Sequence, residues 1–374
     1  MIEILNPQNK LDYKMPTKVY FGRGAIDVLS KIIKESPSSK FILVAGSHFY
    51  GSEDYKKIEK VDVYPRKIKK STFEEINALV KYLQDGKYDG VIAIGGGVIM
   101  DCAKIAAAVA VNGGIAEDYL VSNTRKIESK GFFYIAVPTT SGTGSEVVPW
   151  GVVWGDMKYS LSSPEYMFPD VAIVDPALTD TCPKYITATS GIDALCQAIE
   201  CYWNNNHNSV SDTHALKSIE TILESLERAV NNPNEDVRNK MAWGSLKGGL
   251  AFSNTGTTIC HAVSYPMTIH WGVAHGQATS ITLPMFIENI FPIIPEERKR
   301  NILKAMGVKE SKQASEKVKK LIEKIGLKTK LSELGILKED IDIIVREGFD
   351  PIRMKSSPKI PLPTQLSEML LGIL

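Results

Sequence analysis

The sequence predicts an α/β domain followed by an all-helical domain, and three observations carry this prediction. Short apolar runs alternate with amphipathic stretches in the first half, which is the pattern of βαβ units around a parallel sheet. The run at residues 91–94 is apolar on both faces, as in a central strand covered by helices on each side. From about residue 183 onward, long segments carry apolar residues at helical spacing. We therefore expect an α/β domain over residues 1–182 and a helical domain over residues 183–374.

The expected elements follow this pattern along the chain. Ser71 to Glu74 form a capping box, so a helix should begin there and stop near Gly86. A further helix should follow the central strand at residues 98–111. Strands are expected at residues 18–21, 41–45, 91–94, 134–137 and 172–174, and helices of the second domain at residues 211–230 and 236–252.

The composition is that of an ordinary globular protein, with 44% hydrophobic and 23% charged residues. The formal net charge is +1 and no basic block is present, which argues against a nucleic-acid partner and against a membrane-surface role. The N-terminus lacks the apolar core of a signal peptide, and no apolar run approaches the roughly 18 residues of a spanning helix, so we expect a cytoplasmic protein. The five cysteines are odd in number and lack C-x-x-C spacing, so they should be reduced thiols.

A glycine triplet marks the first candidate ligand site. Gly95, Gly96 and Gly97 directly follow the central strand and precede a helix, where backbone N–H groups and the helix N-terminus can hold a pyrophosphate. Asp101 and Lys104 lie one and two turns into that helix. A tight turn without a ligand is the alternative.

A second loop, residues 138–146, offers five hydroxyls and two glycines after the strand at residues 134–137. Ligands of open α/β sheets bind at this carboxyl edge of the strands. A surface loop rich in Ser and Thr is the alternative interpretation.

The second domain holds a candidate metal site. Asp193 and Gln197 are spaced i, i+4, which places both on one face of a helix, and Glu200 follows one turn later. His261, expected mid-helix, and His275, where a loop enters a new helix, lie in rather apolar surroundings. Imidazole nitrogen together with carboxylate oxygen suits Zn²⁺ or Fe²⁺. Buried histidines that bind no metal are the alternative.

Together these segments resemble the iron-containing, or group III, alcohol dehydrogenase family over nearly the whole chain. The glycine triplet with Asp101 and Lys104 is similar to one family signature, and residues 138–146 match its Thr-Thr-Ser-Gly-Thr-Gly-Ser-Glu loop without departure. Residues 191–200 and 249–276 are similar to its metal-binding helix and to its segment with two histidines. The resemblance implies a dehydroquinate-synthase-like fold, in which a dinucleotide-binding α/β domain and a helical domain enclose the cofactor and the metal.

The resemblance also implies roles for individual residues. Asp193, His261 and His275 would bind one divalent metal, Fe²⁺ or Zn²⁺, and take part in catalysis. Gln197 stands where the family usually has a histidine as fourth ligand. The residues implied to contact the nicotinamide dinucleotide are Gly95, Gly96, Gly97, Asp101, Thr139, Thr140, Thr143 and Lys158.

Three departures from the family pattern bear on chemistry. Gln197 is neutral and binds a borderline metal less strongly than imidazole, which makes Zn²⁺ as good a candidate as Fe²⁺. Tyr265 stands where many members have a histidine near the substrate, so Tyr265 or His270 would have to serve as the proton relay. Gly46 and Ser47 stand where many NAD-preferring members have an acid, which leaves room for a 2′-phosphate and favours NADP over NAD.

We therefore expect a metal-dependent, NAD(P)-linked alcohol dehydrogenase or aldehyde reductase that acts on a small alcohol or aldehyde as a homodimer or larger homo-oligomer. A set of aromatic residues and one segment are similar to a subgroup that handles aldehydes with an anionic tail, such as phosphonoacetaldehyde: Trp150, Trp154, Tyr202, Trp203 and residues 157–161. Arg353 and Lys355 would hold the tail, unless they are a solvated surface pair. The alternatives are a sugar-alcohol oxidase of the same family, a dehydroquinate-synthase-like lyase or cyclase, and a non-catalytic member whose metal site has decayed.

Overall fold

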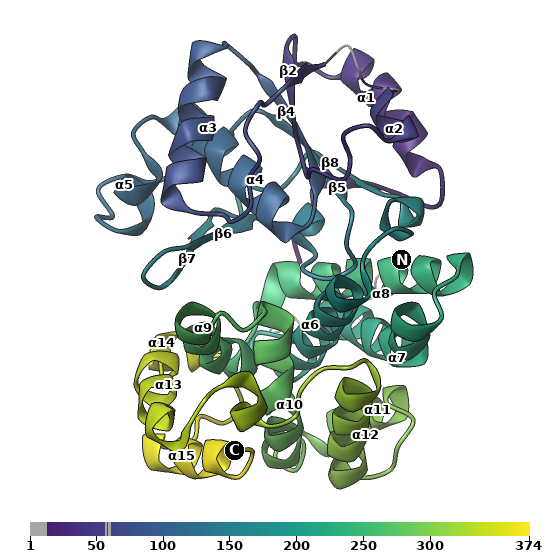
Figure 1. Cartoon of the computed structure of the whole chain (residues 1–374), viewed down its shortest axis with the longest axis vertical. Coiled ribbons are helices and arrows are strands. Elements are labelled where there is room, and N and C mark those ends of the chain that lie inside the picture. The colour runs from purple at the N-terminus through teal and green to yellow at the C-terminus, as the bar shows by residue number, and fades with distance from the viewer. Residues whose placement is uncertain (1–12, 57, 59–60) are drawn as a thin grey trace, which may run out of the picture.

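The computed structural model describes residues 13–374 apart from residues 57, 59 and 60, and for residues 352 and 353 it describes the backbone alone. A parallel six-stranded sheet in the order β1-β8-β5-β4-β2-β3 forms the α/β domain, and a bundle of helices forms the second domain (Figure 1). The predicted fold class is thus confirmed. The strands are β1 (Lys18–Phe21), β2 (Phe41–Ala45), β3 (Asp62–Val63), β4 (Gly90–Gly95), β5 (Phe133–Pro138) and β8 (Val171–Val174).

The central strand β4 is apolar on both sides because helices cover both faces of the sheet. Val91 and Ala93 pack in one hydrophobic cluster with α3 (Phe73–Asp85) and α4 (Gly97–Asn112). Ile92 and Ile94 point to the opposite face and pack with the 3₁₀ turn η1 (Ala25–Val28) and α1 (Leu29–Glu35). The short helices α2 (Glu53–Lys56) and α5 (Ala116–Leu120) complete this domain.

The start of α3 differs by one residue from the prediction. The N-cap is Thr72, whose hydroxyl accepts a hydrogen bond from the Glu75 backbone N–H. Ser71 instead donates its hydroxyl to the Val152 carbonyl, 2.5 Å away. The capping box was misplaced because Ser71 and Thr72 are both good N-cap residues, and a tertiary contact uses the first of them.

The sequence pattern did not predict an antiparallel hairpin, β6 (Trp150–Trp154) and β7 (Lys158–Ser162), which forms a separate two-stranded sheet. The hairpin lies against α4, and its Gly151 allows the close approach. A Cβ at this position would lie 2.9 Å from the Asp101 carbonyl oxygen and 2.8 Å from the Ile105 side chain. The hairpin therefore brings two tryptophans beside the glycine loop.

The helical domain is arranged around α6 (Lys184–Trp203), in which every residue from Gly191 to Trp203 is buried. Helices α7, α8 and α10 pack against it. Polar side chains on this helix therefore have to find partners inside the protein or in a ligand. The other helices are α7 (Ser209–Asn231), α8 (Glu235–Thr255), α9 (Ile259–Trp271), α10 (His275–Ile290), α11 (Glu296–Ala305), α12 (Ser311–Lys324), α13 (Ile341–Gly348), α14 (Pro351–Met354) and α15 (Pro363–Leu371).

Short 3₁₀ turns connect these elements: η2 (Ser145–Val147), η3 (Pro176–Thr179), η4 (Leu331–Leu334) and η5 (Lys338–Asp340). We propose the domain boundary between residues 182 and 183, after η3 and just before α6 begins. All five cysteines are free thiols, and four of them are buried.

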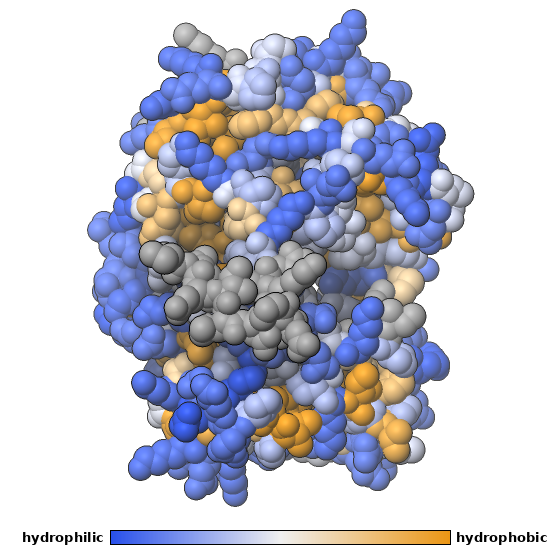
Figure 2. Space-filling view, turned by 180° about the vertical axis from the view of Figure 1, so that it is seen from behind, coloured by the Kyte–Doolittle hydropathy of each residue, from blue (hydrophilic) through white to orange (hydrophobic). Residues whose placement is uncertain are grey.

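The surface seen in Figure 2 is mainly hydrophilic, with apolar side chains in separate patches. Within the part of the chain that the structure describes, no helix combines the length and the apolar character needed to cross a membrane.

Candidate active site

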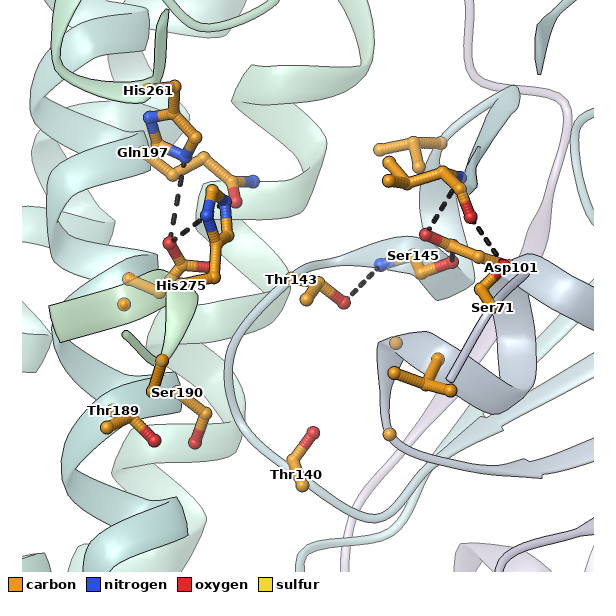
Figure 3. Close-up of a pocket in the computed structure, with 18 of the residues that line it drawn as sticks. Ser71, Asp101, Thr140, Thr143, Ser145, Thr189, Ser190, Gln197, His261 and His275 are labelled. Carbon is orange, nitrogen blue, oxygen red and sulfur yellow. Dashed lines mark hydrogen bonds and ion pairs between the residues drawn. The ribbon is translucent and has the colours of Figure 1, made fainter. Parts of the chain in front are cut away.

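A cavity of about 310 Å³ lies between the two domains and is lined by residues of both. The glycine turn of α4, the loop after β5 and the hairpin β6–β7 contribute from the α/β domain. The helices α6, α9 and α10 contribute from the helical domain. Figure 3 shows the side chains of the two domains facing one another across this space.

The glycine turn is packed closely against the loop after β5. A Cβ on Gly97 would lie 2.8 Å from the Thr143 side chain, and one on Gly95 would lie 2.6 Å from Ile99. Gly96 is the N-cap of the 16-residue helix α4. The backbone N–H groups of its first turn carry the partial positive charge that a pyrophosphate prefers.

The structure divides the residues implied to contact the dinucleotide into two sets. Those that line the cavity are Gly96, Gly97, Asp101, Thr140, Thr143 and Lys158. Gly46, Ser47, Gly95 and Thr139 are not among its lining residues. Thr139 donates its backbone N–H to Gly95, and Gly46 donates to Ile94, so both lie at the carboxyl edge of neighbouring strands. Their contacts with a cofactor remain predictions.

Lys104 does not reach the cavity, because its ammonium group is hydrogen-bonded inside the protein. It donates to the carbonyl oxygens of Ser145 (2.6 Å), Val148 (2.9 Å) and Trp150 (2.9 Å). The carboxylate of Asp101 accepts from the Ser145 hydroxyl and from the Val152 N–H. Burial lowers the pKa of Lys104 to about 8 and raises the pKa of Asp101. These two residues hold the loop after β5 and the hairpin in place.

On the opposite wall, Asp193, His261 and His275 converge. Figure 3 shows the two histidines side by side there. The Nε2 atoms of His261 and His275 lie 3.7 and 3.9 Å from Asp193 Oδ1, and one ligand atom from each residue lies within 4.8 Å of the others. Both separations exceed hydrogen-bond length, so the three groups face one another without bonding.

The positions of the two histidines follow from local packing. His261 lies in the first turn of α9, not mid-helix as expected, because α9 begins only at Ile259. His275 is the first residue of α10, as predicted. Beside it, a Cβ on Gly276 would lie 1.9 Å from the Thr189 carbonyl oxygen, so only glycine allows α10 to approach α6 this closely.

Glu200 orients His261, a role that spacing alone did not reveal. It is fully buried, and its Oε2 pairs with Nδ1 of His261. Its Oε1 accepts from the Thr258 hydroxyl and from the Cys260 N–H, both at 2.8 Å. A carboxylate behind an imidazole fixes the tautomer, so that Nε2 is presented to the cavity as an acceptor.

The electrostatics of the cluster suit a cation. Burial raises the pKa of Asp193, and burial together with His261 and Lys158 lowers the pKa of His275 well below its usual range. His275 is therefore neutral at pH 7, as a metal-binding imidazole must be. Gln197, 2% exposed, lines the same cavity, and its Nε2 has no hydrogen-bond partner. A carboxylate and two imidazoles fit a divalent metal, and Gln197 would have to add its amide oxygen, because the unpartnered Nε2 is a donor.

The two proton-relay candidates lie in different places. His270 is at the surface, where its Nε2 is 2.5 Å from Oε2 of Glu347. Tyr265 is buried, its ring stacks on His275 with centroids 5.9 Å apart, and Lys158 donates to its hydroxyl at 2.7 Å. Lys355, predicted to hold an anionic tail, is exposed and lines neither this cavity nor its side chamber, and the side chain of Arg353 lies outside the described residues.

Two family models match the chain: that for iron-containing alcohol dehydrogenases over residues 16–176, and that for the C-terminal part of the same family over residues 187–371. The chain belongs to the iron-containing alcohol dehydrogenase family. The predicted family and the predicted oxidoreductase activity are thereby confirmed.

Named relatives within this family cover most of the chain. The long-chain-alcohol dehydrogenase 1 of Geobacillus thermodenitrificans is 35% identical over 81% of this chain and 79% of its own length. The NAD-dependent methanol dehydrogenase of Bacillus methanolicus is 27% identical over 96% of this chain and 98% of its own length. Among solved structures, the sulfoacetaldehyde reductase of Bifidobacterium kashiwanohense in complex with NAD⁺ superposes with a TM-score of 0.90 and 30% identity, covering 97% of this chain and 98% of its own.

The chain is therefore a metal-dependent alcohol dehydrogenase or aldehyde reductase that uses a nicotinamide cofactor, as this family does. The match to this family favours the dehydrogenase over the lyase or cyclase considered from the sequence.

Proposed function

We propose that this enzyme interconverts a short aldehyde and its alcohol, with the dinucleotide on the glycine turn and the metal held by Asp193, Gln197, His261 and His275. The convergence of the Asp-His-His cluster with Gly96 and Gly97 on a single cavity carries the proposal. When bound, the metal would act as a Lewis acid on the substrate oxygen, and the nicotinamide would donate or accept the hydride.

The protein's own groups orient and shield these partners. The N-terminus of α4 and the hydroxyls of Thr140 and Thr143 would hold the phosphates of the dinucleotide. Trp150 and Trp154 of the hairpin, which line the cavity, would exclude water from the reacting carbon. Of the two candidates for the proton relay, we propose Tyr265, which is buried, because His270 is exposed and contacts Glu347 at the surface.

A substitution of His261 tests the metal assignment. We expect His261→Ala to lose the metal and to lower kcat/KM at least about 10³-fold, because the cation stabilises the developing alkoxide by several kcal/mol. Circular dichroism should show an intact fold, and elemental analysis should show the lost metal. The matched control is His270→Ala, which should keep both metal and turnover. Normal turnover in His261→Ala would refute the metal role.

For cofactor choice we propose a preference for NADP. The support is Gly46 and Ser47, which follow β2. Neither residue has a carboxylate, and a carboxylate at this place would repel a 2′-phosphate. The similar sulfoacetaldehyde reductase was crystallised with NAD⁺. The ratio of kcat/KM for NADPH over NADH decides the matter, and Ser47→Asp should shift that ratio toward NADH. A wild-type ratio below one would reject the preference.

For the substrate we propose a small aldehyde with an anionic tail. The likeness to a sulfoacetaldehyde reductase supports this class over a sugar alcohol. A screen of NAD(P)H oxidation over small aldehydes with and without an anionic group is the direct measurement. A preference for polyols in the reverse direction would favour the sugar-alcohol alternative.

A further inference from the structure

A side chamber of about 210 Å³ opens from the active-site cavity between the hairpin β6–β7 and α9. Its lining residues are Lys158, Ser160, Thr257, Thr258, Ala262 and Tyr265. Lys158 and Thr257 also line the main cavity, so the two spaces meet at these residues. The chamber is assembled from a hairpin of one domain and a helix of the other, and Lys158 and Ser160 belong to the segment whose resemblance suggested an anionic tail.

The lining is rich in hydroxyls and carries one sign of charge. Four of the six lining residues have hydroxyls, one is a lysine, and none of these described residues is acidic. The Thr258 hydroxyl donates to Glu200 behind the chamber, whereas no hydrogen bond to a protein group involves the hydroxyls of Ser160 and Thr257 among the described residues.

Lys158 is held at the junction of the two spaces. Its ammonium donates to the Tyr265 hydroxyl at 2.7 Å and lies 4.1 Å from the centroid of that ring.

We propose that this chamber binds the anionic head of the substrate, a sulfonate, phosphonate or carboxylate carried by a short aldehyde. The inference rests on the proposed function and assigns its substrate-tail site to Lys158, Ser160 and Thr257. An oxyanion can accept hydrogen bonds from the ammonium and both hydroxyls. An apolar tail would desolvate the same groups without replacing their hydrogen bonds.

The geometry also limits the length of the substrate. The Tyr265 ring on the chamber wall stacks directly on His275, and Trp154 lies 5.8 Å from His275, ring centroid to ring centroid. The chamber is therefore one side chain away from the metal-ligand cluster. We therefore expect a short linker between the head group and the carbonyl of the substrate.

A pair of aldehydes of the same shape tests the assignment. Sulfoacetaldehyde and 3,3-dimethylbutanal differ in carrying a sulfonate or a tert-butyl group on the same carbon, and phosphonoacetaldehyde extends the anionic arm. We expect the wild type to favour the anionic aldehydes in kcat/KM by about 100-fold, and the preferred anion identifies the natural head group. Equal kcat/KM for the charged and neutral aldehydes would overturn the tail site while leaving the proposed function intact.

Variants of Thr257 report on the chamber itself. We expect Thr257→Val to lower the ratio of kcat/KM for anionic over neutral aldehyde on the order of tenfold, through loss of one hydrogen bond to a charged group. Thr257→Asp should lower that ratio further, by at least about 100-fold, through like-charge repulsion. Thr213→Val, on the exposed face of α7, is the matched control and should leave the ratio at the wild-type value. A Thr257→Asp ratio equal to wild type would refute the assignment.

Binding without turnover separates this inference from the proposed function. Ethanesulfonate, which has the head group but no aldehyde, should bind saturably to the wild-type enzyme and more weakly to Thr257→Asp, as measured by isothermal titration calorimetry. If the enzyme turns over no aldehyde, the proposed function fails, but this titration still tests whether the chamber binds an anionic head group. If ethanesulfonate shows no saturable binding, or binds the wild type and Thr257→Asp equally well, the assignment of the chamber as the tail site is wrong.

Discussion

The two walls of the active-site cavity both contain buried polar and charged side chains, but they use them in opposite ways. On the α/β wall, Lys104 makes hydrogen bonds to three carbonyl oxygens and Asp101 accepts two hydrogen bonds. On the helical wall, Asp193, His261 and His275 lie beyond hydrogen-bond distance of one another, and the Gln197 Nε2 has no partner. Protein groups alone satisfy Lys104 and Asp101 on the first wall, whereas the cluster on the second wall is left open for a ligand.

This difference shows that residues of one family signature, the glycine triplet with Asp101 and Lys104, can serve the fold and not the reaction. Asp101 and Lys104 belong to a motif that suggests a cofactor site, yet the lysine is 3% exposed and serves the fold of the loop and hairpin. A buried ionic group that is fully hydrogen-bonded positions its neighbours, whereas an incompletely satisfied cluster marks the place where a ligand must bind. The comparison predicts stability effects on the first wall and ligand-affinity effects on the second.

The largest effect should come from Lys104→Met. The substitution leaves three buried carbonyls and Asp101 without their cation, which should lower the free energy of unfolding by about 3–5 kcal/mol. Denaturant unfolding measures this loss, with the exposed Lys312→Met as control. Wild-type stability combined with a lost activity would show that Lys104 acts on a ligand and would break the distinction between the walls.

The next effect concerns Glu146, which is 3% exposed behind the same wall. Burial raises its pKa from the usual 4.5 to about 7. Between these two pKa values the folded protein keeps a proton that the unfolded chain releases. The contribution of Glu146 to the free energy of unfolding therefore falls as the pH rises from 4.5 to about 7, and it stays at the lower value above that pH. Glu146→Gln should remove this slope and add about 3 kcal/mol at pH 8 relative to wild type. Unfolding curves at pH 5 and pH 8 test this, and an unchanged slope would contradict it. Glu316→Gln, at the surface, is the control.

On the helical wall, Glu200→Gln should act on the ligand. An amide cannot hold the imidazole of His261 as a carboxylate does, and loss of such a supporting group lowers metal affinity about 10–100-fold. Metal affinity is measured by competition with a chelator, and the thermal midpoint of the metal-free protein is measured in parallel. A large drop in that midpoint with unchanged affinity would assign Glu200 to the scaffold instead.

The smallest effect should be a gain. Gln197→His replaces an amide by the stronger donor to a borderline metal and should raise Zn²⁺ affinity on the order of tenfold. The gain should be smaller for Mn²⁺, which prefers oxygen ligands. Equal affinities in wild type and variant would show that residue 197 does not reach the metal, and the helical wall would then hold a three-residue site.

Local signals explain what sequence reasoning predicted well. The apolar runs of β2, β4, β5 and β8 and the glycine turn before α4 depend on neighbours in the chain, and their bounds were predicted within one residue. The hairpin β6–β7 has no such signal, since its stability comes from contact with α4 and from the Gly151 approach. The capping residue of α3 was misplaced for the same reason, because a contact 81 residues away engages Ser71.

The sequence by itself determined the fold class, the family and the set of polar residues from which the active site is built, because periodicity and motifs are properties of neighbouring residues. Only the tertiary structure decided which of those residues meet. Glu200 finds His261 across 61 residues, Lys158 finds Tyr265 across 107, and His270 is carried to the surface although it shares a helix with His261. Such pairings depend on how helices cross and on how closely a glycine lets them approach, and no spacing along the chain encodes that distance.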